Sequence, residues 1–277
     1  MDAFSTRVFG GNQAGVALPE RELPDARMQQ VAAEFKHSET AFVRLEKDGS
    51  VTLRYFTPAG EVELCGHATV ASFALLRQLG RIGDGDVTAH TRAGELSVTV
   101  QGGTVWMDMA KPRLLRELGE DEWDAFYEAY GLTTADRPEG LTPAIVSTGL
   151  ADVMLPVRDH DTLMRAVQNE AAVTAKKYDV TGVHMFCLGD GCTAYCSNYA
   201  PLYDIPEECA TGTSNGALTY YLYLRGIVQP GQENVFLQGE HMHRPSEIRS
   251  RLYEQDGAVN VRVGGSAVMS MQCEVKI

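Results

Sequence analysis

Hydrophobic and polar residues alternate along several short segments of the chain, and this period of two is typical of half-buried β-strands. Strands are predicted at residues 51–56, 96–100, 105–109 and 259–263, where β-branched or aromatic residues alternate with other residues. A Gln-Gly-Gly-Thr turn at residues 101–104 separates two of them and predicts a hairpin. Helices are predicted at residues 24–37, 120–130, 162–168, 70–79 and 216–225. Many strands with few helices indicate an α+β fold.

The helices predicted at 70–79 and 216–225 are rich in Ala, Leu and aromatic residues on nearly all sides. A helix without a polar face is buried, here inside a curled sheet. Its N-terminus is then buried too, and the free backbone N–H groups of the first turn suit an anion such as a carboxylate.

The segment around the first of these helices is repeated later in the chain. At residues 54–80 and again at 197–226, a strand ending in proline is followed by an acidic loop, a cysteine, small residues and an apolar helix closed by glycine. Ordered repetition of this kind predicts two pseudo-symmetric domains, each a curled mixed β-sheet or barrel around a central helix. We place the domains at residues 1–112 and 113–277, with the alternative that the last strand returns to the first half.

Composition narrows the functional classes. The formal net charge of −13 argues against a nucleic-acid partner. No apolar run approaches the ~18 residues of a membrane span, and the N-terminus lacks the pattern of a signal peptide, so no membrane partner is expected. The six cysteines are too sparse for a disulfide scaffold, which favours a cytoplasmic protein with free thiols.

Cofactor and metal motifs are also missing from the sequence. Neither a Walker motif nor a dinucleotide-binding fingerprint is present, and we expect no cofactor. Cys187, Cys192 and Cys196 do not have the spacing of a zinc site, so we expect no metal.

The repeated cysteines, Cys65 and Cys209, are candidates for chemistry. At a helix N-terminus the helix dipole lowers the pKa of a thiol. Two such thiols on opposite sides of one cleft could remove a proton from one face of a carbon and return one to the other face. The alternative is that both are small core residues, and that Thr211, Thr213 and Ser214 simply cap a helix.

Motifs spread over nearly the whole chain resemble those of the PhzF-like family of phenazine biosynthesis. They lie at residues 2–4, 11–16, 38–43, 65–69, 147–150, 209–218 and 244–246. The resemblance implies a diaminopimelate epimerase-like fold, an isomerase activity with the active site between the two halves, and a homodimer.

The resemblance also implies site residues. Glu39 corresponds to the general acid/base of the isomerase that names the family, and His67 to its supporting histidine. Glu208 stands where the pattern has Asp, and Thr213 where it has Ser. Asn12, Gly66, Thr211, Gly212 and Ser214 complete the predicted binding set. Cys65 and Cys209 depart from typical members, which have Ala and Pro there, and match places where diaminopimelate epimerases carry catalytic cysteines.

We therefore expect a cofactor-independent isomerase or epimerase that transfers a proton on a small carboxylate, amino-acid-like or cyclic. A Cys65/Cys209 pair implies racemisation or epimerisation, whereas Glu39 with His67 and Glu208 implies a hydrogen shift. Two alternatives remain: a binding or scaffold protein of this family without turnover, and a cysteine hydrolase, for which His67 is an awkwardly placed base.

Overall fold

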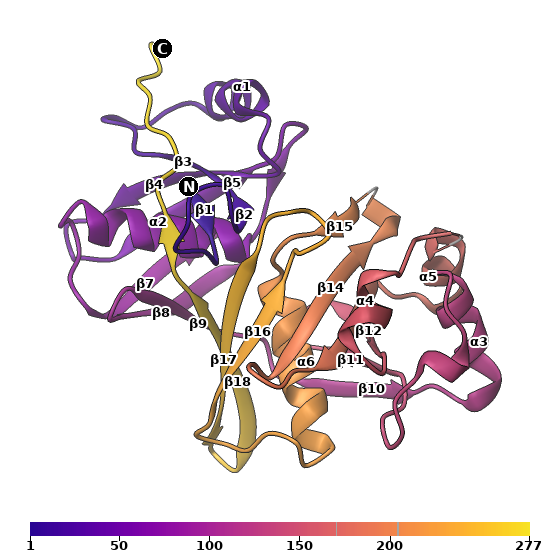
Figure 1. Ribbon diagram of the computed structural model, residues 1–277. Helices are drawn as coiled ribbons and strands as arrows, with labels where there is room; N and C mark the ends of the chain where they lie inside the picture. The colour runs from indigo at the N-terminus through magenta and orange to yellow at the C-terminus, as the bar shows by residue number, and fades with distance from the viewer. Residues whose placement is uncertain (170, 204) are drawn as a thin grey trace. The chain divides into compact units, whose positions relative to one another are not determined.

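The computed structural model describes residues 1–169, 171–203 and 205–277, which divide into two compact units. Unit 1 comprises Met1–Asp108 together with Gly264–Ile277, and unit 2 comprises Met109–Val263 (Figure 1). The domains expected at 1–112 and 113–277 stay a prediction. None of the described helices is long and apolar enough to span a membrane.

Unit 1 contains two helices and two sheets. Its helices are α1 (Asp25–Phe35) and α2 (Gly66–Gln78). The larger sheet has the order β3-β4-β5-β7-β8-β9, with β6 beside β5, and the smaller one has the order β19-β1-β2. Their strands are β1 (Asp2–Ala3), β2 (Asn12–Gln13), β3 (Gly15–Ala17), β4 (Thr40–Leu45), β5 (Val51–Phe56), β6 (Glu61–Val62), β7 (Gly85–Thr91), β8 (Gly94–Gln101), β9 (Thr104–Asp108) and β19 (Ala267–Val268).

The sequence pattern explains the strands of unit 1. In β5 the predicted alternation is realised, because Val51, Leu53 and Tyr55 are buried while the residues between them are partly exposed. The hairpin between β8 and β9 also forms as predicted. Its two turn residues, Gly102 and Gly103, both have positive φ, which is the backbone conformation of the tightest hairpin turns.

Helix α2 is the buried centre of unit 1. Its contacts run to β1, β2, β3, β4, β9 and β19, so strands of both sheets surround it. Val70, Phe73 and Leu76 are buried to within 1% of their surface. The expectation of a buried apolar helix is confirmed for residues 67–76, of which only Ala74 is partly exposed, whereas Arg77 and Gln78 at the end of the helix are exposed.

Unit 2 has a mixed sheet with helices on both faces. Its sheet has the order β10-β11-β12-β13-β14-β16-β17-β18, with β15 beside β14. The strands are β10 (Arg113–Glu117), β11 (Ala144–Ser147), β12 (Ala151–Pro156), β13 (Gly182–Leu188), β14 (Ala194–Ala200), β15 (Ile205–Glu208), β16 (Glu233–Gln238), β17 (Ser246–Gln255) and β18 (Ala258–Gly265). The helices are α3 (Glu120–Glu128), α4 (His160–Met164), α5 (Ala171–Tyr178) and α6 (Gly212–Leu224), with 3-10 turns at Thr134–Asp136 and Pro201–Tyr203.

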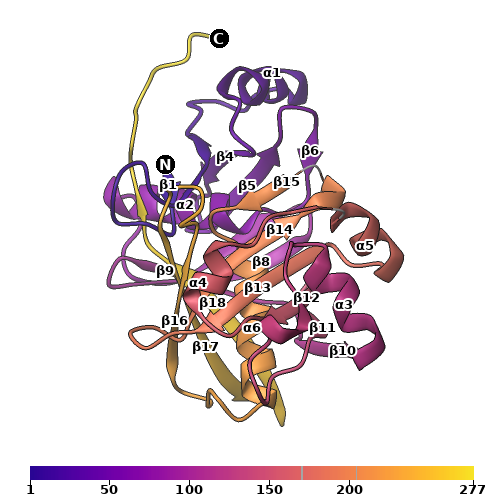
Figure 2. The same cartoon turned by 45° about the vertical axis from the view of Figure 1, so that its right-hand side comes forward.

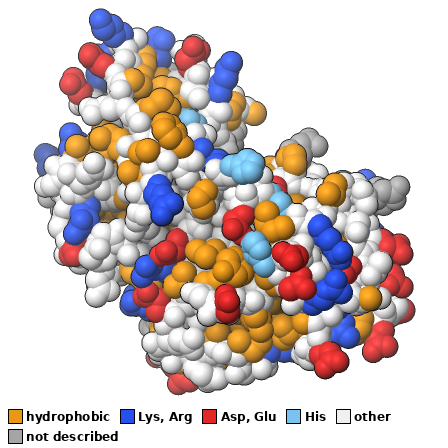
Figure 3. Space-filling view, in the orientation of Figure 1, with side chains coloured by type: hydrophobic (Ala, Val, Ile, Leu, Met, Phe, Trp, Pro, Cys, Tyr) orange, Lys and Arg blue, Asp and Glu red, His pale blue; other side chains and the backbone are white. Residues whose placement is uncertain are grey.

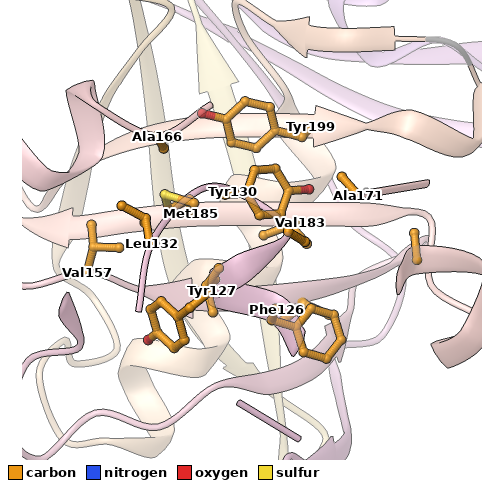
Figure 4. Packing of buried hydrophobic residues seen from close by; sticks show 14 of the residues in the cluster. Phe126, Tyr127, Tyr130, Leu132, Val157, Ala166, Ala171, Val183, Met185 and Tyr199 are labelled. Atoms are coloured by element: carbon orange, nitrogen blue, oxygen red, sulfur yellow. The ribbon is translucent and has the colours of Figure 1, made fainter. Parts of the chain in front are cut away.

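The two faces of the sheet are used differently, because neighbouring residues of a strand point to opposite sides. Val153, Val183 and Met185 belong to the core that packs against α3 and α5 (Figure 4). Phe186, the next residue of β13, instead contacts Tyr221 of α6 with ring centroids 5.6 Å apart. Helix α4 lies against β13 and β14 (Figure 2). The even-numbered residues of β12 and β13, which include Asp152 and His184, therefore face α6.

Several helix boundaries differ from the predictions. Helices α2 and α6 begin at Gly66 and Gly212, four residues before their predicted starts, because the small residues of both loops already form the first helical turn. The helix predicted at 162–168 is the shorter α4, and α5 was not predicted.

On the surface, acidic and basic side chains are interspersed on the face that Figure 3 shows, despite the net charge of −13.

Candidate active site

In unit 1 the N-terminus of α2 brings together a thiol and an imidazole. Cys65 is the N-cap residue in an extended conformation, and its side chain does not cap the helix. Its Sγ lies 3.4 Å from Nδ1 and 3.8 Å from Nε2 of His67, in the first turn. Both residues are buried, with 7% and 8% of their surfaces exposed. Cysteine and histidine two positions apart at this helix start thus form a close polar pair.

Glu39 reaches the same imidazole from a different element. It directly precedes β4, and its backbone oxygen accepts a 3.0 Å hydrogen bond from the N–H of Gly15, which anchors the loop to β3. The Oε2 atom of Glu39 lies 3.3 Å from Nε2 of His67. This oxygen is buried and accepts no hydrogen bond from any described residue. Ser38 Oγ lies 3.4 Å from the same nitrogen.

The backbone that carries this cluster is held by a buried hydroxyl pair. Thr69 Oγ1 donates to the carbonyl of Cys65 at 2.7 Å and lies 2.6 Å from the hydroxyl of Tyr55. Burial raises the pKa of Tyr55 well above its ordinary value, so the phenol stays neutral. Of the other predicted residues, Asn12 is buried in β2 opposite Ala3. A methyl group on Gly66 would meet Met107 only at 3.6 Å, an ordinary contact, so packing does not require glycine there.

In unit 2 the N-terminus of α6 is surrounded by uncharged polar groups and by the carboxyl groups of Glu208 and Asp152. Thr211 is its N-cap residue, and Thr211 Oγ1 lies 3.1 Å from both Glu208 Oε2 and Asn198 Oδ1. Gln238 accepts a hydrogen bond from the N–H of Thr211 and donates at 2.7 Å to the carbonyl of Glu208. Asn215 in turn donates to both Gln238 and the carbonyl of Thr211. The predicted residues Glu208 and Thr211 are therefore close together.

A row of polar residues from neighbouring strands supports this helix start. Ser214 donates a 2.6 Å hydrogen bond to Asp152 Oδ2 of β12. His184 of β13 lies 3.3 Å from Asn215 through Nε2 and 3.2 Å from Asn198 through Nδ1. A neutral imidazole satisfies both contacts by donating to one amide and accepting from the other. Burial also favours the neutral imidazole, because it lowers the pKa of His184 to about 4.

The remaining predicted residues of unit 2 have different surroundings. The backbone oxygen of Thr213 accepts a 2.8 Å hydrogen bond from Thr148. Cys209 is buried, with 5% of its surface exposed. Burial raises the pKa of its thiol and outweighs the opposing effect of Arg244. The expectation that the helix dipole lowers this pKa is wrong for Cys209.

The starts of α2 and α6 correspond to each other at different residues from those that the sequence repeat predicted, which paired Cys65 with Cys209. Both helices begin with glycine, Gly66 and Gly212, after an N-cap residue in similar extended conformations, φ −144° and ψ 112° for Cys65 and φ −131° and ψ 105° for Thr211. The counterpart of Cys65 is thus Thr211, and Cys209 lies two residues before the N-cap. The helix dipole acts only within the first turn, which explains why Cys209 does not benefit from it.

Sequence reasoning missed Asp152, His184, Asn198 and Gln238. Each lies on a strand with 3% or less of its surface exposed, and in β12 and β13 the residues other than Asp152 and His184 are apolar or glycine. A polar residue inside an otherwise apolar strand is a signal in itself, because burial of a polar group is unfavourable without a partner. The partner could not be identified without the pairing of the strands.

Comparison with known proteins identifies the family. The family model described as phenazine biosynthesis-like protein, PhzC-PhzF, matches residues 1–273. The chain belongs to this family. A Deinococcus radiodurans relative of the family, named as an uncharacterized isomerase, is 33% identical over 290 residues, covering 98% of this chain and 91% of its own. The Escherichia coli K12 protein named uncharacterized isomerase YddE is 30% identical over 287 residues, covering 99% and 96%. The expected enzyme class, isomerase, is confirmed.

Solved structures of the phenazine biosynthesis-like family have the same fold. The Bacillus anthracis PhzF family protein has a TM-score of 0.89 and 25% identity, covering 100% of this chain and 97% of its own. The predicted epimerase PA4716 from Pseudomonas aeruginosa has a TM-score of 0.76 and 29% identity, covering 96% and 93%. A hydroxyproline epimerase from Agrobacterium vitis, at 12% identity and a TM-score of 0.57 over 87% of this chain and 76% of its own, shares the fold alone. The predicted α+β, epimerase-like fold is confirmed.

Proposed function

We propose that the protein is an isomerase that moves a proton between two carbon positions of a small carboxylate, amino-acid-like or cyclic, with Glu39 as the acid/base. The observation that carries the proposal is the position of Glu39 Oε2, 3.3 Å from His67 Nε2 at the start of the buried helix α2. Because Oε2 accepts no hydrogen bond from a described residue, its lone pairs are available for a substrate proton.

The two neighbours of Glu39 have supporting roles in this proposal. His67 places its Nε2 3.3 Å from the carboxylate, where an imidazolium would stabilise the ionised form, and its ring lies beside Cys65. The first turn of α2 offers backbone N–H groups that have no acceptor within the helix, and these suit the carboxylate of the substrate. Negative charge that develops when the proton leaves carbon is stabilised by the same groups.

The surroundings of Cys209 favour this one-base scheme over a pair of thiols. A thiol pair needs two cysteines of matching position and acidity, but the counterpart of Cys65 in the second repeat is Thr211. Cys209 has a raised pKa and little exposed surface, both unfavourable for a catalytic thiolate. Glu208 stays a predicted catalytic residue. The predicted binding residues also stay predictions, namely Asn12, Gly66, Thr211, Gly212, Thr213 and Ser214, as do the homodimer and the cytoplasmic location.

The test is hydrogen exchange in D₂O with a panel of amino acids, hydroxyproline-like cyclic acids and dihydroaromatic acids, read by mass spectrometry and chiral chromatography. We expect one class to gain deuterium or to isomerise. Glu39→Gln should lower the rate by at least about 100-fold, since it removes the acid/base. The matched control is Glu95→Gln, because Glu95 also pairs with a histidine, at 3.6 Å, but on the surface of unit 1.

The outcomes separate the alternatives. Full activity of Glu39→Gln would overturn the assignment of the acid/base. Loss of activity in Cys209→Ala with loss of optical purity in the wild-type reaction would restore the thiol pair. If compounds of the panel stabilise the protein thermally but none exchanges hydrogen, the protein is a binding protein without turnover, and the proposal is wrong.

A further inference from the structure

His241 lies in the segment 239–245 that joins β16 to β17, and both nitrogens of its imidazole face oxygen acceptors. Nδ1 lies 3.2 Å from Oε2 and 3.3 Å from Oε1 of Glu207 in β15. Nε2 lies 2.9 Å from the carbonyl oxygen of Met164 at the end of α4. A carboxylate and a carbonyl can only accept, so each nitrogen needs a hydrogen, and only the imidazolium has both.

From this arrangement we propose that His241 is a pH-sensitive switch, whose imidazolium fixes segment 239–245 on β15 and α4 and thereby holds the start of α6 in place. The proposal is independent of the reaction that the protein catalyses. His184 provides the contrast within unit 2, because its two neighbours, Asn198 and Asn215, are amides that can donate as well as accept. A neutral ring therefore satisfies the contacts of His184 but not those of His241.

The groups around His241 favour its protonated form. The hydrogen bond to Glu207 raises the pKa of His241 and outweighs the opposing effect of burial, and the carbonyl of Met164 and the charge of Glu240 act in the same direction as Glu207. The side chains of His241 and Glu207 are only 19% and 13% exposed. Solvent and salt therefore screen this pair less than a pair on the surface.

Neighbouring elements add no charge that opposes the imidazolium. From β14, the uncharged Ser197 places its Oγ 3.3 Å from Nδ1 of His241. Tyr199 on the same strand, which the charge of Glu207 reaches, stays neutral because burial raises its pKa. From α4, His160 places its Nε2 2.6 Å from Oε2 of Glu240, so its nearest partner is that carboxylate. The pair of His160 and Glu240 is 40% and 41% exposed and contributes little.

Segment 239–245 packs directly on the loop that leads into α6. Its first residue, Gly239, follows Gln238, which is hydrogen-bonded to both ends of that loop. Gly239 has φ +87°, and a methyl group there would lie 2.7 Å from the carbonyl oxygen of Cys209, so the two backbones are in close contact. Arg244 in turn acts on the thiol of Cys209 and opposes the rise of its pKa. A shift of the segment is therefore transmitted to the start of α6.

Loss of the proton from His241 opens the switch. Nδ1 then presents a lone pair to the carboxylate of Glu207, and two acceptors repel each other. Glu207 precedes Glu208, whose Oε2 lies 3.1 Å from Oγ1 of Thr211, the N-cap residue of α6. Because its surroundings raise the pKa of His241, the segment is fixed below about pH 6.5 and is released as the pH rises through the raised pKa.

The first measurement is a pH titration of the full-length protein labelled with ¹⁵N-histidine, followed by long-range ¹H–¹⁵N NMR, which distinguishes an imidazolium from either neutral tautomer. The variant His241→Gln identifies the signals of His241. We expect His241 to titrate clearly above about pH 6.5, the value for an exposed histidine. Glu207→Gln should lower this midpoint. Glu240→Gln is the matched control and should lower it less, because that carboxylate faces His160.

The second measurement is hydrogen exchange between about pH 6 and about pH 9, read by mass spectrometry on peptides covering 207–215 and 239–245 and corrected for the intrinsic effect of pH. The open population should rise by up to about tenfold for each unit by which the pKa of His241 exceeds 6.5. His241→Gln should remove this dependence, whereas His160→Gln should keep it.

Thermal unfolding shows which variants are folded, and Glu207→Gln, which should reduce the dependence, replaces His241→Gln if the latter does not fold. A midpoint of His241 at or below about pH 6.5 would overturn the proposal. So would exchange in both peptides that stays independent of pH while His241 loses its proton.

Discussion

Ser214 donates a 2.6 Å hydrogen bond to Asp152, a carboxylate with only 3% of its surface exposed, and so ties the first turn of α6 to β12. Burial raises the pKa of Asp152 to about 6, despite the opposing effect of the Ser214 hydrogen bond. Asp152 therefore ionises at about pH 6 rather than in the usual acidic range. Because Ser214 belongs to α6, the protonation state of Asp152 affects the first turn of this helix.

The first prediction concerns the pH dependence that Asp152 adds to stability. Its folded pKa lies above its unfolded value, so the stabilisation is complete below about pH 4 and is lost as the pH rises through about 6. The total is about 3 kcal/mol. Asp152→Asn should remove this dependence. The unfolding free energy of the variant should therefore rise relative to that of the wild type as the pH increases from 4 to 6.5. Denaturant unfolding at several pH values measures the difference.

Asp256→Asn is the matched control for this prediction, because Asp256 is exposed in a turn with φ +52°, which asparagine tolerates. Its stability should follow that of the wild type at every pH. If the unfolding free energies of Asp152→Asn and the wild type changed with pH in parallel, Asp152 would not be a buried carboxyl group with a raised pKa.

The second prediction concerns His184, whose pH dependence has the opposite sign. Burial lowers its pKa to about 4, below the unfolded value near 6.5. Its contribution is therefore complete above pH 6.5 and is lost as the pH falls towards 4, by about 3 kcal/mol. His184→Gln keeps a donor for Asn215 and should flatten the loss on the acid side. If the variant loses stability as steeply as the wild type between pH 6.5 and 4, the imidazole is not held neutral.

The third prediction concerns Gly11, next to the predicted binding residue Asn12. Gly11 has φ +62°, and a methyl group there would lie 2.1 Å from the carbonyl oxygen of Ala3. Gly11→Ala should cost more than about 3 kcal/mol of unfolding free energy, because strain adds to the clash. Gly49→Ala is the control: its φ is +88° with nothing within 4 Å, and it should cost only about 1 kcal/mol. Equal losses in urea unfolding would show that the clash is relieved by local movement.

The fourth prediction concerns the reactivity of Cys209. Because this thiol is buried and its pKa is raised, iodoacetamide should modify Cys273 first and Cys209 much more slowly in the native protein. Peptide mass spectrometry over time at pH 8 gives the order, and unfolded protein provides the reference rates. Modification of Cys209 at the rate of Cys273 would return it to the candidates for a catalytic thiol.

Local sequence signals predicted part of this molecule correctly. The strand 51–56 and the hairpin at 101–104 follow from alternation and from two adjacent glycines, since both are decided by near neighbours in the chain. The motifs that contain Glu39, Cys65 and His67 predicted residues that the structure does bring together.

Other features depend on contacts that are distant in sequence. The residues Gly212 to Asn215 have low helix propensity and resembled a capping loop, but burial of α6 extends the helix through them. Asp152, His184 and Asn198 become neighbours only because β12 pairs with β13 and β13 with β14. No local pattern specifies that pairing, so this polar row could not be predicted from the sequence.

The two ends of the chain meet in the small sheet of unit 1, where Asp2 of β1 pairs with Val268 of β19. During synthesis the ribosome releases β1 first and β19 last. Unit 2, whose residues are continuous from Met109 to Val263, is fully synthesised before β19 leaves the ribosome. Unit 1, which carries Glu39, Cys65 and His67, therefore cannot complete the small sheet beside α2 until all of unit 2 has been synthesised.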